Sequence, residues 1–485
     1  MRDEAEFSML NYIRILTICI THSDIDHQPN FLALAQVPVV FLFSTKNSIV
    51  SLLLGPGHGY EKVDYIHRWS GRCLFLGTVV HGSLWIPNHL QYNVQIIGAQ
   101  KDTRSLAALG VLCGIVLTSL RPVRKWSRDS FWVVHVLGFV AFFITICYHT
   151  IYATPWIFPP LAFYTADMLM RMLRVRIKDA TLTAVDSNMT WVLQDCDTNW
   201  IAGQHVRLRV FFSGRVFESH PLTIMNAPAA YECHLSRIAE KSSRALNNYA
   251  DKAISNNDQS SLSDQPALPP EAPVQVMLDG PYGGCSLDLG QYQTVLLIAD
   301  GSGATFTICV LDDIIGCCAR LGRPNNERTR RIEFVWCLRS YTGINWFTSL
   351  ILPIANVVAD SPELDLPISA YVTCLCNPEA VPPIPNSDVL MLAQRPDTLK
   401  ILENAVVLAG GSDNEDVKYQ GSTPEPSEAS AKLQWVGLGG AGVAVCTSGP
   451  GTLTREASNA VAKSSLLRES ELGGVGLHTE VFSVQ

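Results

Sequence analysis

Residues 130–152 read SFWVVHVLGFVAFFITICYHTIY and contain no charged side chain. A helix that crosses a bilayer needs about 20 predominantly apolar residues, so this stretch predicts a transmembrane helix. Two histidines, His135 and His149, lie inside it. Ionisable residues in membrane spans are rare and usually functional, so this segment points to both the fold and the chemistry.

Further apolar segments lie on either side of this one. Residues 67–87 and 105–120 are predicted to span the membrane, and 31–54 and 154–170 are weaker candidates. Lys46 interrupts the first weaker segment, and Pro159, Pro160 and Asp167 the second. Residues 7–20 contain Arg14 and are too short to span alone. We expect a helical membrane domain over 1–172.

Basic residues set the orientation of this domain. One cluster follows the third predicted helix, and the other follows the last one. Basic loops face the cytosol, and two crossings separate the clusters, so both assignments agree. The part of the chain after the membrane domain is therefore expected in the cytosol. The two clusters are Arg121, Arg124, Lys125 and Arg128, and Arg171, Arg174, Arg176 and Lys178.

The histidines in the predicted spans form two pairs. His67 and His81 are 14 residues apart, and so are His135 and His149. In a helix, 14 residues return to within about 40° of the starting direction and rise roughly 21 Å. Both helices run outward, so His67 comes level with His135 and His81 with His149. Such pairs can ligate two stacked haems; the plainer interpretation is that each is a polar residue facing the bundle.

The composition excludes several functions. A net charge of -8 gives no electrostatic case for nucleic-acid binding. The 14 cysteines lack the regular spacing of a zinc site or a disulfide scaffold, and we expect most of them buried in a reducing compartment. The acidic start is unlike a secretory signal. His58 and His89 are expected in solvated loops.

The run His67-Arg68-Trp69-Ser70-Gly71-Arg72, followed by His81, resembles the signature of ferric reductase transmembrane domains. Residues 34–38 and 46–48 resemble the segment before it in fungal members. The resemblance is to the fungal ferric reductase and NADPH oxidase-like family. It implies a transmembrane helical bundle followed by a ferredoxin reductase-like module, which combines an FAD-binding β-barrel with an α/β nucleotide-binding domain. It also implies a chain shortened at its N-terminus.

The segment 173–290 has the strand-and-turn pattern of the expected FAD-binding barrel. Within it, His220-Pro221-Leu222-Thr223-Ile224 resembles the flavin-contacting His-Pro-Phe-Thr/Ser-Ile motif of such barrels. Residues 202–206 resemble the strand entry that precedes this motif in the family. The polar stretch 255–270 is expected to be a disordered insertion.

The segment 291–485 is expected to bind NADPH. The apolar strand 294–299 leads into Gly301, Ser302, Gly303 and Thr305, and an apolar helical run follows. A glycine turn there lets a pyrophosphate approach the helix N-terminus. Residues 411–430 are expected to form a polar loop.

Later elements resemble the same family. Trp336, Arg339 and Trp346-Phe347 are similar to its Trp-x-x-Arg and Trp-Phe elements. Cys446, Gly449 and Pro450 resemble its Cys-Gly-Pro turn beside the nicotinamide, and residues 478–482 resemble its C-terminal tail.

The chain also departs from the family pattern. Asp300 stands where the family has its first turn glycine, and Thr447 and Ser448 separate Cys446 from Gly449. The last residues, 483–485, lack the family's terminal aromatic residue.

The resemblance implies an NADPH-dependent ferric-chelate reductase that supports iron uptake. Electrons would pass from NADPH through FAD and two b-type haems to a ferric chelate or cupric ion outside the cytoplasm. His67 and His135 would hold the inner haem, and His81 and His149 the outer one. We expect an integral protein of the plasma membrane. Two alternatives remain open: a superoxide-generating NADPH oxidase with oxygen as acceptor, and a truncated, non-catalytic membrane protein.

Overall fold

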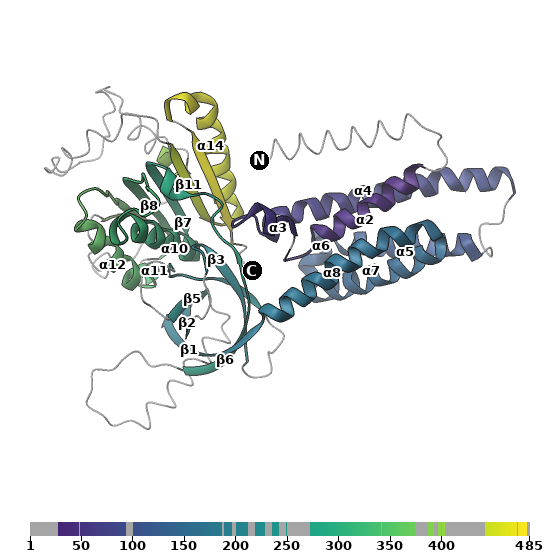
Figure 1. Cartoon of the computed structure of the whole chain (residues 1–485), viewed down its shortest axis with the longest axis horizontal. Coiled ribbons are helices and arrows are strands. Elements are labelled where there is room, and N and C mark those ends of the chain that lie inside the picture. Colours follow the sequence, from purple (N-terminus) through teal and green to yellow (C-terminus); the bar gives the residue numbers. More distant parts are fainter. Residues whose placement is uncertain are drawn as a thin grey trace. The chain divides into compact units, whose positions relative to one another are not determined.

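The computed structural model forms two compact units, Met1–Leu173 and Arg174–Gln485 (Figure 1). It describes residues 28–47, 49–93, 100–186, 189–195, 200–211, 219–227, 235–241, 249, 272–340, 342–373, 387–391, 396–398, 400–402, 442–472 and 474–482. The expectations for 7–20, 255–270, 411–430 and 483–485 lie outside these residues.

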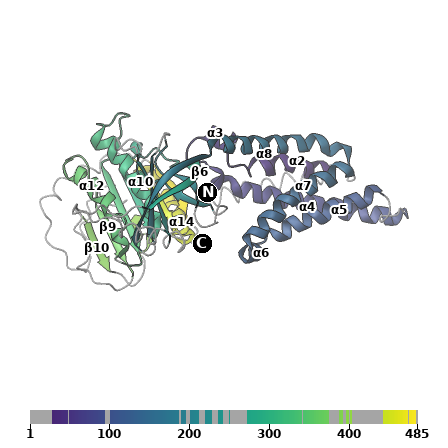
Figure 2. The ribbon, with the colours of Figure 1, turned by 90° about the horizontal axis from the view of Figure 1, so that it is seen from below.

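The first unit is helical, as expected. Helix α2 packs against α4, and α5 packs against α7. These helices run lengthwise beside one another in both views (Figures 1 and 2). The helices are α2 (Gln28–Leu42), α3 (Ile49–Leu54), α4 (Tyr60–Gln91), α5 (Gln100–Thr118), α6 (Arg121–Trp126), α7 (Arg128–His149) and α8 (Thr154–Arg174).

Large apolar side chains cover the outside of this unit. Leu76 on α4, and Leu137 and Ile144 on α7, are all more than half exposed. Exposed apolar area of this kind suits lipid better than water. Among the described helices, two are long and apolar enough to span a membrane, Ser130–His149 and Gly301–Arg320. The second is mostly buried in the other unit, as the core helix of a soluble fold would be.

The predicted span 31–54 is not one helix. Helix α2 ends at Leu42, and α3 begins at Ile49. The Ser44 hydroxyl donates to the Phe41 carbonyl, and the Thr45 hydroxyl donates to that of Leu42. Hydroxyls that bond nearby carbonyls compete with the helical ladder, which accounts for the break.

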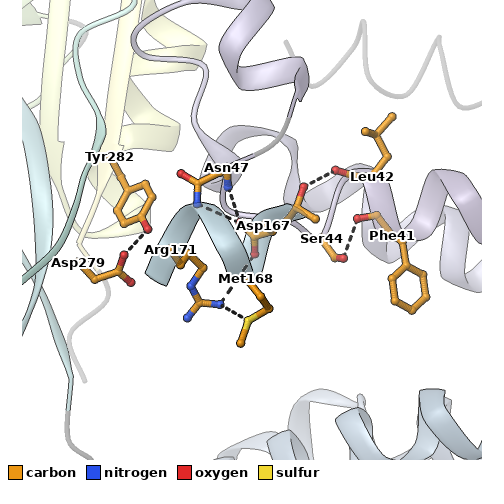
Figure 3. Close-up of polar contacts among 10 residues, drawn as sticks. Phe41, Leu42, Ser44, Asn47, Asp167, Met168, Arg171, Asp279 and Tyr282 are labelled. Atoms are coloured by element: carbon orange, nitrogen blue, oxygen red, sulfur yellow. Dashed lines mark hydrogen bonds and ion pairs between the residues drawn. The ribbon is translucent and has the colours of Figure 1, made fainter. Parts of the chain in front are cut away.

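The segment after this break is tied to α8. The buried Asp167 carboxylate accepts hydrogen bonds from the Asn47 backbone N–H at 2.8 Å and its Nδ2 at 3.1 Å. Arg171, one turn further along α8, lies 3.8 Å from the same carboxylate (Figure 3). The break after Leu42 and the Asp167 that interrupts the segment 154–170 are therefore joined through Asn47.

The second unit begins with an antiparallel sheet in the order β4-β3-β6-β1-β2-β5. The strong curve of β6 curls the sheet (Figure 1). Alternate side chains, among them Leu182, Val192, Leu208 and Leu278, fill its core. The strands are β1 (Arg176–Asp186), β2 (Met189–Asp195), β3 (Gln204–Val210), β4 (His220–Thr223), β5 (Leu235–Lys241) and β6 (Ala272–Gly283).

A parallel sheet follows in the order β10-β9-β8-β7-β11-β12. Its strands are β7 (Thr294–Asp300), β8 (Arg331–Leu338), β9 (Ile368–Val372), β10 (Ser387–Met391), β11 (Val443–Gly449) and β12 (Val475–Val481). Between or after these strands in the chain lie the helices α10 (Ala304–Ile315), α12 (Thr348–Ala359) and α14 (Gly451–Leu472).

The chain leaves β7 toward β8 on one side, and β11 returns on the other. In open α/β sheets, such a reversal of strand order leaves a ligand crevice at the carboxyl ends of the two strands.

Candidate functional site

His67 and His135 come together in the helical unit. Their ring centres lie 6.2 Å apart and their planes are inclined by 63°. Helix α4 carries His67, and α7 carries His135. His81 lies 14 residues further along α4, and His149 ends α7, so each helix repeats the histidine at the same spacing.

The Nδ1 atoms of three of these histidines have hydrogen-bond partners. His67 Nδ1 lies 2.8 Å from the Val40 carbonyl oxygen on α2. His135 Nδ1 lies 3.4 Å from the Ser119 hydroxyl, and His149 Nδ1 lies 2.6 Å from the Ser105 hydroxyl. Histidines that bind metals typically donate the other ring N–H to such an acceptor. Sequence reasoning missed these partners.

The distance between the His67 and His135 ring centres is the one expected for two imidazoles that share one iron. A ligating imidazole nitrogen lies about 2 Å from its metal, and the ring centre about 1 Å further out. Two imidazoles on opposite sides of one iron would therefore have centres roughly 6 Å apart. The observed 6.2 Å agrees with this distance.

His89 corrects a sequence expectation. It was expected in a solvated loop, but it lies in the last turn of α4, and its Nε2 is 3.9 Å from the largely buried Asp102 carboxylate. The apolar run stops near Pro87, yet α4 continues to Gln91, because a helix end need not coincide with a change in hydropathy. His58 lies outside the helices, as expected.

The predicted flavin motif forms β4 and the residue after it. Val206 pairs with Leu222, and His205 with Thr223, across β3 and β4. Leu222, Thr223 and Ile224 are buried, whereas Pro221 is exposed. Proline removes a backbone donor, which suits an exposed position at the edge strand of this sheet.

The predicted glycine turn lies between β7 and α10. Gly301, Ser302 and Gly303 form a short 3₁₀ turn at the start of the helix. A Cβ on Gly303 would come within 2.4 Å of the Ser448 carbonyl oxygen, so only glycine fits there. The Thr305 hydroxyl donates to the Ser302 carbonyl and braces the turn. The helix N-terminus is thus held directly beside β11.

Gly449 ends β11 next to the end of β7. A Cβ on Gly449 would lie 3.0 Å from the Asp300 Cβ. The two predicted segments, 301–305 and 449–450, therefore meet at one edge of the sheet, where the strand order reverses. Asp300 stands at the same edge.

Cys446 lies apart from that edge. It is fully buried within β11, paired with Leu297 on one side and His478 on the other, and its Sγ is 4.0 Å from the Cys285 Sγ. The two residues that directly precede Gly449 are Thr447 and Ser448. Both are fully buried, and their hydroxyl oxygens have no hydrogen-bond partner among the described residues. The inserted Thr447 and Ser448 were the sequence signal for this shift.

Taken together, these features define a class of protein. A membrane bundle with facing histidines is followed in the chain by an antiparallel sheet and by a parallel sheet of the dinucleotide-binding type. This is the architecture of a membrane protein with a dinucleotide-binding domain.

Comparison with known proteins identifies the family. The model "Ferric reductase like transmembrane component" matches residues 30–146, and "Ferric reductase NAD binding domain" matches residues 292–462. The two matches together cover more than half of the chain. The chain belongs to the ferric reductase family, is an integral membrane protein, and carries the NAD-binding domain of that family.

Two of the relatives are fungal proteins. The chain is 26% identical to ferric reductase transmembrane component 1 of Schizosaccharomyces pombe, over 65% of this chain and 60% of that protein. It is also 26% identical to ferric reductase transmembrane component 3 of Saccharomyces cerevisiae, over 56% of this chain and 37% of that protein. The chain thus spans less than two thirds of the length of these relatives.

Among solved structures, a ferredoxin NADP+ reductase from Neisseria gonorrhoeae with bound FAD and NADP matches at 11% identity and a TM-score of 0.35. The match covers 63% of this chain and 98% of that chain. A likeness of this size adds nothing to the family matches.

Proposed function

We propose that the chain is a transmembrane ferric-chelate reductase that takes electrons from NADPH on the cytosolic side and delivers them to Fe(III) outside the cytoplasm. The observation that carries this proposal is the pair of facing imidazoles, His67 and His135, in a chain with the reductase domains of this family. When bound, NADPH, FAD and haem supply the hydride and single-electron chemistry.

The roles of the protein's own residues follow from their positions. Gly301, Ser302, Gly303 and Thr305 would receive the pyrophosphate of NADPH at the start of α10, where backbone N–H groups and the helix dipole favour an anion. Gly449 and Pro450 would lie beside the nicotinamide. The hydroxyls of Thr447 and Ser448 are buried just before Gly449. We assign Ser448 the place beside the nicotinamide that the family motif predicted for Cys446.

The β4 segment would hold the flavin. The exposed Pro221 and the backbone of His220 to Ile224 would flank it, and the buried Thr223 hydroxyl would supply a hydrogen-bonding group. His67 with His135, and His81 with His149, would then fix two haems at two depths along α4 and α7.

The orientation follows from charge. The basic clusters 121–128 and 171–178 would face the cytosol, and the reductase unit would then also lie in the cytosol. We assign the chain to the plasma membrane, where a ferric or cupric acceptor outside the cell is accessible.

The test measures NADPH-dependent formation of a ferrous chelate by membranes that contain the chain, with His135→Ala as the matched variant. The proposal predicts activity that His135→Ala abolishes. Superoxide output without ferric reduction would favour the oxidase alternative. NADPH oxidation no faster than in control membranes would favour the non-catalytic one.

A further inference from the structure

Helix α5 repeats the spacing of the histidines. Ser105 lies in α5, and Ser119 directly follows it, 14 residues further along the chain. His135 and His149 on α7 are also 14 residues apart. The two helices pack against each other, and Ser119 meets His135 while Ser105 meets His149. The helices are therefore antiparallel and in matching register.

The Ser119 contact fixes the direction of its hydrogen bond. The Ser119 hydroxyl donates to the Ile115 carbonyl oxygen at 2.6 Å, so its proton is already used. Its oxygen can therefore only accept from His135 Nδ1. The proton then sits on Nδ1, and the Nε2 lone pair is the one available to a metal.

The Ser105 contact is shorter. His149 Nδ1 and the Ser105 oxygen are 2.6 Å apart, and both groups are partly buried. If Nε2 of His149 ligates iron, its Nδ1 must carry the proton, and Ser105 must accept it. The same arrangement is thus repeated at the other end of the helix pair.

We propose that α5 and the residue directly after it orient the haem ligands: Ser105 and Ser119 hold His149 and His135 in the Nδ1–H form and strengthen them as ligands. This inference rests on the proposed haem ligation and adds two positioning residues to it. On α4, His67 Nδ1 has a backbone acceptor instead, the Val40 carbonyl oxygen. No side-chain substitution removes this acceptor.

The expected effect of losing an acceptor has a definite sign. An imidazole that donates from Nδ1 becomes a more electron-rich ligand and favours ferric over ferrous iron. Removing the serine oxygen should therefore raise the reduction potential of the haem concerned. Loss of such an outer partner typically weakens metal binding about 10- to 100-fold.

The test is a spectroscopic redox titration of the purified, haem-loaded full chain. Ser105→Ala should raise the midpoint of one haem, and Ser119→Ala that of the other, with a smaller shift because the His135 contact is longer. Ser105→Thr, which keeps a hydroxyl, should restore the wild-type midpoint. Thr118→Val is the matched control, because the Thr118 hydroxyl bonds only carbonyls of its own helix, those of Gly114 and Ile115.

The outcomes separate this inference from the proposed function. A wild-type chain that binds no haem would contradict both the proposed function and this inference. A wild-type chain with two haems whose midpoints stay unchanged in Ser105→Ala and Ser119→Ala overturns the inference alone. If Ser105→Ala does not fold, Ser105→Cys replaces it, because cysteine has nearly the shape of serine but is only a weak hydrogen-bond acceptor. The inference then requires that Ser105→Cys raise the midpoint of the same haem.

Discussion

The imidazole rings of His67 and His135 face each other from two different helices at a centre-to-centre distance of 6.2 Å. Neither helix holds its ring alone. His67 is bonded to the carbonyl of Val40 on α2, and His135 to Ser119 at the end of α5. The proposed function depends on this pair, because it turns a spacing in the sequence into a candidate metal site.

Asp167 should be needed for the stability of the helical unit. Asp167→Ala removes the acceptor of two partly buried hydrogen bonds from Asn47 (Figure 3). Each hydrogen bond contributes about 0.5–1.5 kcal/mol, so the loss of both should clearly lower the melting temperature in detergent. Asp64→Ala is the control. It removes an exposed ion pair with Arg68 that is worth less than about 1 kcal/mol, and it should change the melting temperature little. Equal melting temperatures for the two variants would contradict this assignment.

Gly303 should be irreplaceable at the start of α10. In Gly303→Ala the new Cβ meets the Ser448 carbonyl oxygen at 2.4 Å, so β11 and the helix must separate. Overpacking of this kind costs about 1–3 kcal/mol and should also weaken NADPH binding. In Gly451→Ala the nearest atom is 3.9 Å away, and stability should be unchanged. A Gly303→Ala protein as stable as Gly451→Ala would show that the contact is not tight.

The stability of the reductase unit should depend on pH through Asp313. Burial, and then the neighbouring Asp312 carboxylate, raise the pKa of Asp313 to about 6. Because this pKa lies above its unfolded value near 4, protonation favours the folded unit. The contribution is fully present below pH about 4 and is lost as pH rises through about 6.

Asp313→Asn tests this dependence. It should stabilise the full chain at pH 7 by about 1–3 kcal/mol and flatten the fall in melting temperature between pH 4 and pH 6. The exposed Asp360→Asn is the control and should keep the wild-type pH profile. An unchanged profile in Asp313→Asn would remove Asp313 as the cause.

Periodicity made much of this protein predictable. Fourteen residues bring a helix back to nearly the same face, so the level pairing of His67 with His135 followed from the sequence alone. The strand, glycine turn and helix around Gly301 were also predictable, because a fully apolar run followed by such a turn is typical of a parallel sheet.

Other features depend on packing between distant segments. The break after Leu42 arises from local hydroxyls and a junction with Asp167, which lies 120 residues beyond Asn47. The place of Cys446 depends on the register of β11 against β7, and a motif with two inserted residues does not determine it. Ser105 in α5 and Ser119 directly after it carry no signal in the sequence until their neighbour α7 is known.

The most direct test of the proposed haem ligation is the dithionite-reduced absorption spectrum of the purified, haem-loaded chain, with haem counted per polypeptide. We predict a b-type spectrum with two haems per chain, and a loss of haem in His135→Ala that leaves the helical content intact. A chain that is folded but shows no b-type signal, or a His135→Ala variant that keeps both haems unchanged, would contradict the claim that these imidazoles hold iron porphyrin in the membrane.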